Sequence, residues 1–340
     1  MIFSKFMTLG HNVAGQAYIF NNGSLSIEEE SRIVETVLAF LPKDIAEKLK
    51  EIPPDQLEHI EEIRIRIHRP IEVTVKGLPR FLSYIVRPED ADHLLNKISH
   101  FSIYTMEEEL RRGYITIEGG HRVGLGGKVI LENGAVKAIR DVSSFNIRIA
   151  REKLGIAEKL VPYLYQGLWS HTLIIGPPQT GKTTLLRDLA RIISSGSPEA
   201  GFGPFKVGIV DERSEIAGSV NGIPQLTFGP RVDILDACPK AEGMMMMVRS
   251  MSPDVLIADE IGRKEDGEAV MEAVNAGIKL IMTTHGSTLA EVKKRPTLSP
   301  LIELGIFERY IELNRSKGPG TITKIKDSFG REMREKARVT

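Results

Sequence analysis

The spacing of hydrophobic positions changes near the middle of this 340-residue chain. In the first half, apolar and polar residues alternate over residues 63–67 and 71–76, which is typical of half-buried strands. In the second half, short apolar runs alternate with segments of helical spacing, the pattern of a parallel sheet covered by helices. The sequence therefore predicts two domains, a smaller α+β domain over residues 1–160 and an α/β domain over residues 161–340.

Further signals in the first half define its helices and remaining strands. Strands are expected on both sides of a glycine turn within residues 114–130 and again at 146–150, so the sheet is antiparallel or mixed. The glycine-rich stretch lacks the following helix of a dinucleotide fingerprint, which excludes that interpretation. Residues 1–26 are weakly patterned and predict a loosely packed arm. Helices are expected at about residues 26–40, 44–50, 88–101, 106–111 and, as a connection between the domains, 151–160.

In the second half, four short apolar runs predict the strands of the parallel sheet. The helix expected over residues 241–251 contains four consecutive methionines, which favour core packing over an adaptable binding surface. A hairpin is expected near the end of the chain. The predicted strands are 172–175, 206–210, 255–258 and 280–284, and the hairpin joins 310–313 to 321–325.

The stretch GPPQTGKTT follows the first of these strands and matches the phosphate-binding pattern G-x-x-x-x-G-K-[ST]. Helical spacing comes after it, so the motif has the strand–loop–helix context that it requires. Glycines let backbone N–H groups and the helix N-terminus point at phosphates. Lys182 would reach the β- and γ-phosphates of ATP, and the Thr183 hydroxyl would bind Mg²⁺. The candidate nucleotide-binding residues are Gly176, Pro177, Pro178, Gln179, Thr180, Gly181, Lys182, Thr183 and Thr184.

Three further strands end in polar residues that would complete the site. The stretch VLIADE offers Asp259 to hold Mg²⁺ and Glu260 to polarise the attacking water. VDERSE offers Asp211 as a second metal ligand and Glu212 as a second catalytic acid. TTHG ends in His285, which could contact the γ-phosphate or the water. The sequence therefore predicts an ATP-hydrolysing site with ATP and Mg²⁺ at one edge of the sheet.

Composition excludes some classes of protein and limits the partners. Apolar residues make up 41% and charged residues 26% of the chain, as in ordinary globular proteins. The 45 basic residues equal the 45 acidic ones, so no overall basic field indicates nucleic acid. The single cysteine, Cys238, excludes an internal disulfide framework. No apolar run is long enough to span a bilayer, and we expect a cytoplasmic protein that can dock on a membrane complex.

The order of these motifs is similar to that of a known family. VDERSE, RSMSPDVLIADEIG and TTHG follow the phosphate-binding loop as in the secretion ATPases of type II and type IV systems and pilus motors. The resemblance covers most of residues 165–313, and EIRIRIHRPIEVTVKG is similar to the opening strands of the family's N-terminal domain. It implies a RecA-like P-loop ATPase domain, a homo-hexameric ring and membrane-embedded channel or secretion partners. It also implies nucleotide contacts from N-terminal arginines, for which the candidates are Arg122, Arg140 and Arg148.

The stretches GYITIEGGHRVGLGGKVI and SFNIRIARE are similar to a sporulation branch of this family. That similarity implies a motor on the mother-cell side of the channel between mother cell and forespore. Two departures from the wider family are the Asp259-Glu260 pair, where Gly-Glu is common, and the absence of the tetracysteine zinc module. An ATP-dependent nucleic-acid translocase or helicase-like enzyme is the alternative, because RecA-like cores also build these, but the neutral charge balance disfavours it.

Overall fold

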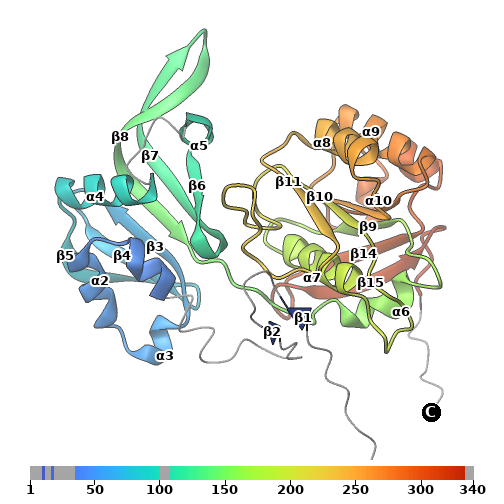
Figure 1. Cartoon of the computed structure of the whole chain (residues 1–340), viewed down its shortest axis with the longest axis horizontal. Coiled ribbons are helices and arrows are strands. Elements are labelled where there is room, and N and C mark those ends of the chain that lie inside the picture. The colour runs from blue at the N-terminus through green and yellow to red at the C-terminus, as the bar shows by residue number, and fades with distance from the viewer. Residues whose placement is uncertain (1–9, 12–16, 19–34, 100–106, 334–340) are drawn as a thin grey trace, which may run out of the picture.

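The computed structural model describes residues 10–11, 17–18, 35–99 and 107–333. These residues form two large sheets joined by an extended connection, one sheet from each half of the chain (Figure 1). The arm predicted for residues 1–26 lies outside them, apart from the short antiparallel pair β1 (Gly10–His11) and β2 (Ala17–Tyr18). Of the helix predicted over residues 26–40, residues 35–40 are described and are helical. Within the described residues, none of the helices has both the length and the apolar content to span a membrane.

The N-terminal sheet is antiparallel throughout, in the order β5-β4-β3-β8-β7-β6. Alternation places Ile63 and Ile65 on one face, where they share a hydrophobic cluster with Leu49 and Leu94 from the helices. Its strands are β3 (Ile60–Arg66), β4 (Pro70–Val75), β5 (Leu78–Ile85), β6 (Tyr114–Ile117), β7 (His121–Glu132) and β8 (Ala135–Arg148). The helices of this half are α2 (Lys43–Lys50), α3 (Pro54–Leu57), α4 (Pro88–Ile98) and α5 (Glu107–Arg112).

Three expectations for this half were wrong or incomplete. Strand β5 was missed because an edge strand with an exposed face lacks clean alternation. The strand expected at 146–150 is the end of the 14-residue β8. The predicted connecting helix over 151–160 is irregular, with only a short 3₁₀ helix at Glu158–Leu160. Its backbone N–H groups at Gly155 and Ala157 donate instead to the carboxylate of Asp188.

The C-terminal sheet has the order β11-β10-β12-β13-β9-β14-β15 and is parallel except for the last strand. The four predicted strands and the terminal hairpin are present, and β11 is an additional edge strand. The strands are β9 (Thr172–Ile175), β10 (Val207–Asp211), β11 (Val232–Asp236), β12 (Val255–Ala258), β13 (Lys279–Thr284), β14 (Arg309–Asn314) and β15 (Thr321–Asp327). The helices are α6 (Val161–Leu164), α7 (Lys182–Ser195), α8 (Lys240–Ser250), α9 (Lys264–Asn275), α10 (Leu289–Val292) and α11 (Ser299–Glu303).

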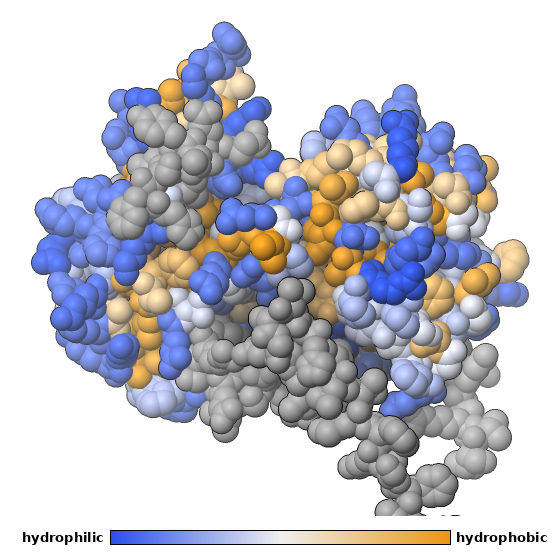
Figure 2. All heavy atoms as spheres, viewed as in Figure 1, coloured by the Kyte–Doolittle hydropathy of each residue, from blue (hydrophilic) through white to orange (hydrophobic). Residues whose placement is uncertain are grey.

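Two hydrophobic clusters cover the two faces of this sheet. Within β9, Ile174 belongs to the cluster under α7, whereas Leu173 and Ile175 belong to the cluster under α8 and α9. Met244 and Met247 are fully buried in the second cluster, which confirms the core interpretation for these two methionines. Figure 2 shows hydrophilic residues over much of the outer surface and apolar residues gathered between the two sheets. The arrangement is a doubly covered sheet whose parallel strands all end at one edge.

Candidate functional site

The phosphate-binding loop lies between β9 and α7 at the carboxyl edge of the parallel sheet. Gly181 adopts φ +85° immediately before the first residue of α7, a left-handed conformation that favours glycine. A Cβ atom at Gly181 would lie 2.9 Å from the backbone nitrogen of Gly320, in the turn of the terminal hairpin. That nitrogen donates to the Thr180 carbonyl at 2.8 Å. The turn of the terminal hairpin therefore packs against the phosphate-binding loop at Thr180 and Gly181.

Lys182 occupies the inside of this loop. Its side chain is buried, and its Nζ donates to the carbonyl oxygens of Gly176 at 3.0 Å and Pro177 at 3.1 Å. Burial lowers the pKa of Lys182, whereas the charges of Asp259 and Glu260 act in the opposite direction. An ammonium group held by two neutral carbonyls beside the N-terminus of α7 is suited to receive an anion.

Thr183 and Asp259 meet at the position expected for a metal ion. The Thr183 hydroxyl donates to Asp259 Oδ2 at 2.5 Å, and the Thr283 hydroxyl donates to Asp259 Oδ1. A hydroxyl and a carboxylate are hard oxygen ligands of the kind that Mg²⁺ prefers, with phosphate and water oxygens supplying the rest. Thr183 and Asp259 therefore fit a Mg²⁺–nucleotide site.

Glu260 is held between two side chains that come from neighbouring strand ends. Arg213 Nη1 donates to Glu260 Oε2 at 2.8 Å, and His285 Nε2 lies 2.9 Å from Glu260 Oε1. His285 also reaches the phosphate-binding loop, because its Nδ1 lies 3.3 Å from Lys182 Nζ. The structure thus brings together the predicted residues Lys182, His285 and Glu260 in one chain of contacts.

The acidic stretch after β10 makes close contacts with its own loop. Asp211 is buried, and its carboxylate accepts the backbone N–H groups of Glu215, Ile216 and Ala217, each at 2.9 Å. Burial raises the pKa of Asp211 to about 6. These bonds give Asp211 a part in shaping the loop, and its role as a metal ligand stays a prediction.

Glu212 is engaged with cations rather than with the phosphate-binding loop. Its carboxylate pairs with Lys240 at 2.9 Å and with Arg263 at 3.6 Å. Asp211, Glu212, Asp259 and Glu260 nevertheless line one shared hollow at the strand ends. The catalytic role predicted for Glu212 stays a prediction.

The three arginines of the N-terminal sheet are in different surroundings. Arg122 pairs with Glu215 and stacks on the ring of Tyr114, with its guanidinium carbon 3.5 Å from the ring centroid. Arg148 lies directly opposite Arg122 in the β7–β8 register, and Arg140 lies opposite Lys128 further along the hairpin. Arg140 and Arg148 are exposed. The nucleotide contacts predicted for all three stay predictions.

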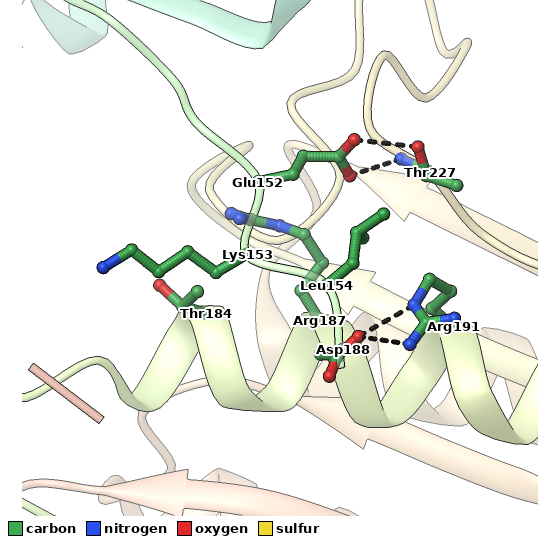
Figure 3. Close-up of a pocket in the computed structure, with 8 residues that line it drawn as sticks. All are labelled: Glu152, Lys153, Leu154, Thr184, Arg187, Asp188, Arg191 and Thr227. Atoms are coloured by element: carbon green, nitrogen blue, oxygen red, sulfur yellow. Dashed lines mark hydrogen bonds and ion pairs between the residues drawn. The ribbon is translucent and has the colours of Figure 1, made fainter. Parts of the chain in front are cut away.

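The connection between the sheets is fixed to the helix that follows the phosphate-binding loop. Figure 3 shows it running down to α7, with Lys153 above Thr184. Asp188 on α7 accepts N–H groups of the connection from Gly155 at 3.2 Å and Ala157 at 2.8 Å. Glu152 accepts both the N–H and the hydroxyl of Thr227, at 2.6 and 2.8 Å. Asp188 thus holds the connection against α7, and Glu152 holds it against the loop that contains Thr227.

Two residues at the site were missed by the motif-based prediction. Arg213 lies within VDERSE but was hidden among acids, and only its contact with Glu260 reveals it. Arg315 in the terminal hairpin donates to Gln179 of the phosphate-binding loop at 3.0 Å, although it lies far away in the sequence. VDERSE places Arg213 at a strand end without indicating its contact with Glu260, and no short motif connects Arg315 to the site.

This strand order, with a phosphate-binding loop between β9 and α7, defines the RecA-like fold of P-loop ATPases, preceded by a smaller α+β domain. Solved structures agree. The ATPase DotB of Yersinia pseudotuberculosis aligns with a TM-score of 0.54 and 15% identity over 85% of this chain and 81% of that one. The pilus retraction motor PilT with bound ADP aligns with a TM-score of 0.52 and 17% identity, over 77% and 76% of the two chains.

Sequence comparison identifies the family within this class. The chain belongs to the family described as sporulation stage III, protein AA, which matches residues 31–333. Its relative in Bacillus subtilis, stage III sporulation protein AA, is 60% identical over 290 residues, 85% of this chain and 94% of that protein. An uncharacterised protein of Porphyra purpurea, ycf45, is 27% identical over 79% of this chain and 43% of its own length.

Proposed function

We propose that this chain is an ATPase whose hydrolysis of ATP drives a sporulation-specific motor. The observation that carries the proposal is the continuous contact from Lys182 through His285 to Glu260, beside the Thr183–Asp259 pair. A phosphate-binding cation, a metal-binding pair and a general base are the parts that phosphoryl transfer to water requires. The sporulation family and the fold of secretion ATPases support the same function.

Each residue of the site has a separate task in the proposed reaction. Lys182 and the backbone N–H groups of the loop bind the β- and γ-phosphates and stabilise the charge that develops during transfer. Glu260 orients a water molecule towards the γ-phosphorus and accepts its proton. Mg²⁺, held by Thr183 and Asp259, neutralises phosphate charge when it is bound.

The motor would assemble as a homo-hexamer on the cytoplasmic face of a membrane complex, on the mother-cell side of the channel to the forespore. In this proposal residues 1–160 close over the nucleotide held by residues 161–340, and closure moves the neighbouring subunits. Support comes from the polar contacts between the N-terminal sheet and the loop after β10, among them Arg122 to Glu215. The balanced charge of the chain, with 45 basic and 45 acidic residues, weighs against a nucleic-acid translocase.

Steady-state ATPase assays of the full chain and of Lys182→Ala test this function. The wild type should hydrolyse ATP only with Mg²⁺, and the variant should be inactive. Wild-type activity that rises strongly on addition of DNA or RNA, with a salt-dependent affinity, would favour the translocase instead. An inactive wild type at every concentration, or an active variant, contradicts the proposed site.

A further inference from the structure

The orientation of Glu260 depends on side chains outside the phosphate-binding loop. Both oxygens of its carboxylate have partners, Arg213 at 2.8 Å and His285 at 2.9 Å. Its backbone is at φ +55°, and its N–H donates to the Thr283 hydroxyl at 2.8 Å. A general base must be aligned with its water to within fractions of an ångström. Whatever fixes Arg213 therefore also affects this alignment.

Arg213 lies on a loop that is rigid at its base. Besides the three backbone bonds to Asp211, Arg187 donates to the carbonyl oxygens of Glu215 and Ile216, both at 2.6 Å. Ser214, at φ +53°, donates to Asp236 at 2.7 Å. The Arg213 side chain itself is 57% exposed, so its own packing does not hold it. Its position follows that of the loop backbone.

The N-terminal sheet rests on this same loop. The hydroxyl of Tyr114, at the start of β6, donates to the carbonyl oxygen of Arg213 at 3.2 Å. Arg122 stacks on the Tyr114 ring and pairs with Glu215, two residues beyond Arg213. The Gly119 N–H donates to Gln225 Oε1 at 3.2 Å, which is a further contact between the two halves of the chain. The sheet is thus in direct contact with the backbone that carries Arg213.

We propose that Arg213 is a positioning residue that aligns Glu260 for hydrolysis, and that Tyr114 makes this alignment depend on the seated position of the N-terminal sheet. The inference rests on the proposed ATPase function and adds a regulatory route to it. When the sheet contacts the loop, Arg213 holds the Glu260 carboxylate in its contact with His285. When the sheet leaves, the loop loses the Tyr114 contact and the base loses its alignment. Hydrolysis is then restricted to the closed arrangement of the two domains.

The proposal is tested by a kinetic double-mutant cycle on the full chain with Arg213→Ala and Tyr114→Phe. Arg213→Ala should lower kcat on the order of 10²-fold, the effect of a misalignment of about 1 Å. Its KM for ATP should stay unchanged, because the contacts of Arg213 are to Glu260 and Tyr114 rather than to the phosphate-binding loop. Arg213→Lys, which keeps the charge, should recover part of kcat. Tyr114→Phe should give a smaller loss of kcat, and the double variant should be no slower than Arg213→Ala.

Each result separates this proposal from the function on which it rests. Wild-type kcat in Arg213→Ala, a raised kcat, or losses that multiply in the double variant would overturn the role of Arg213. A loss seen in KM alone would also overturn it, since Arg213 would then act on binding. Lys182→Ala is the matched control. If this variant is active, the proposed ATPase site itself is wrong, whatever the Arg213 variants show.

Discussion

The ammonium of Lys182 lies 3.3 Å from Nδ1 of His285. An ammonium group can only donate hydrogen bonds, so Nδ1 must accept and the ring proton of a neutral imidazole must be on Nε2. That nitrogen lies 2.9 Å from Glu260 Oε1 and donates to it. Lys182 therefore fixes the tautomer of the histidine that contacts Glu260, the proposed general base. Arrival of a γ-phosphate at Lys182 would be transmitted to Glu260 through this ring.

Replacing His285 tests whether this ring connects Lys182 to Glu260. His285→Ala should retain ATP binding and lose on the order of 10²-fold in kcat, because of the two contacts described for the Glu260 carboxylate only that with Arg213 remains. His285→Gln places an amide NH₂ near the position of Nε2 and should retain more activity than His285→Asn, whose amide reaches only the Nδ1 position. Nucleotide binding by fluorescence and steady-state rates are the measurements. Equal activity of the Gln and Asn variants would contradict the assigned tautomer.

Variants at Lys182 and Glu260, the two ends of this chain of contacts, should affect ATP binding and ATP hydrolysis differently. Lys182→Ala should lose both ATP affinity and hydrolysis, because Lys182 is the one cationic side chain of the phosphate-binding loop and is buried inside it. Glu260→Gln should bind ATP normally and turn over about 10²–10⁴-fold more slowly, since the amide keeps the shape but cannot accept the proton. Isothermal titration with ATP and single-turnover assays distinguish the two. If Glu260→Gln hydrolyses ATP at the wild-type rate, the base is elsewhere, and Glu212 and Glu215 are the next candidates.

The pH dependence of stability should report on His121. This residue is buried at the start of β7, where its Nδ1 accepts the Ala150 N–H at 3.0 Å. Burial, with a smaller effect from Arg151, lowers the pKa of His121 from 6.5 to about 4. Below pH 6.5 the unfolded chain therefore binds a proton at His121 that the folded chain does not bind. The contribution of neutral His121 to stability is fully present above pH 6.5 and is lost as the pH falls towards 4.

The expected loss is on the order of 3 kcal/mol, at about 1.4 kcal/mol for each pKa unit. Urea unfolding between pH 4 and pH 7 measures it. His121→Asn is the control, because its amide oxygen can accept the Ala150 N–H and does not titrate. The difference between wild type and variant should shrink as the pH falls, and a constant difference would mean that His121 titrates normally in the folded protein.

Asp188 should contribute to stability through the connection between the sheets. Asp188 is 2% exposed and accepts two backbone N–H groups as well as Arg191. Asp188→Ala leaves those donors unpaired, which costs about 1–3 kcal/mol for a buried group. Asp188→Asn keeps one carbonyl oxygen and should cost less. Urea unfolding gives both values, and identical midpoints for Asp188→Ala and wild type would show that water replaces the carboxylate.

The sequence alone could predict those features of this molecule that depend on residues close together in the chain, but not those that depend on distant residues. The phosphate-binding loop and the VLIADE and TTHG strand ends could be recognised locally, because each needs only a buried strand followed by particular polar residues. The irregular connection could not, since its helical spacing is overruled by a carboxylate 31 residues away, at Asp188. Arg213 was missed for a similar reason. Its partner Glu260 is 47 residues distant, and only the parallel register of β10 and β12 brings the two strand ends together.

The arginines of the N-terminal sheet lead to a prediction about assembly. Arg122 and Arg148 are cross-strand partners and so point to the same face, whereas Arg140 lies further along the hairpin opposite Lys128. If this face closes over a nucleotide, Arg148→Ala should lower kcat by up to about 10³-fold, as arginines on a transferring phosphoryl group do in GTPases. Arg140→Ala should have a smaller effect and serves as the matched control for loss of an exposed positive charge. Particle mass with a non-hydrolysable ATP analogue should show a ring for both variants. Full activity of Arg148→Ala would mean that hydrolysis does not need closure by this face. A monomeric particle with full activity would mean that hydrolysis does not need a ring.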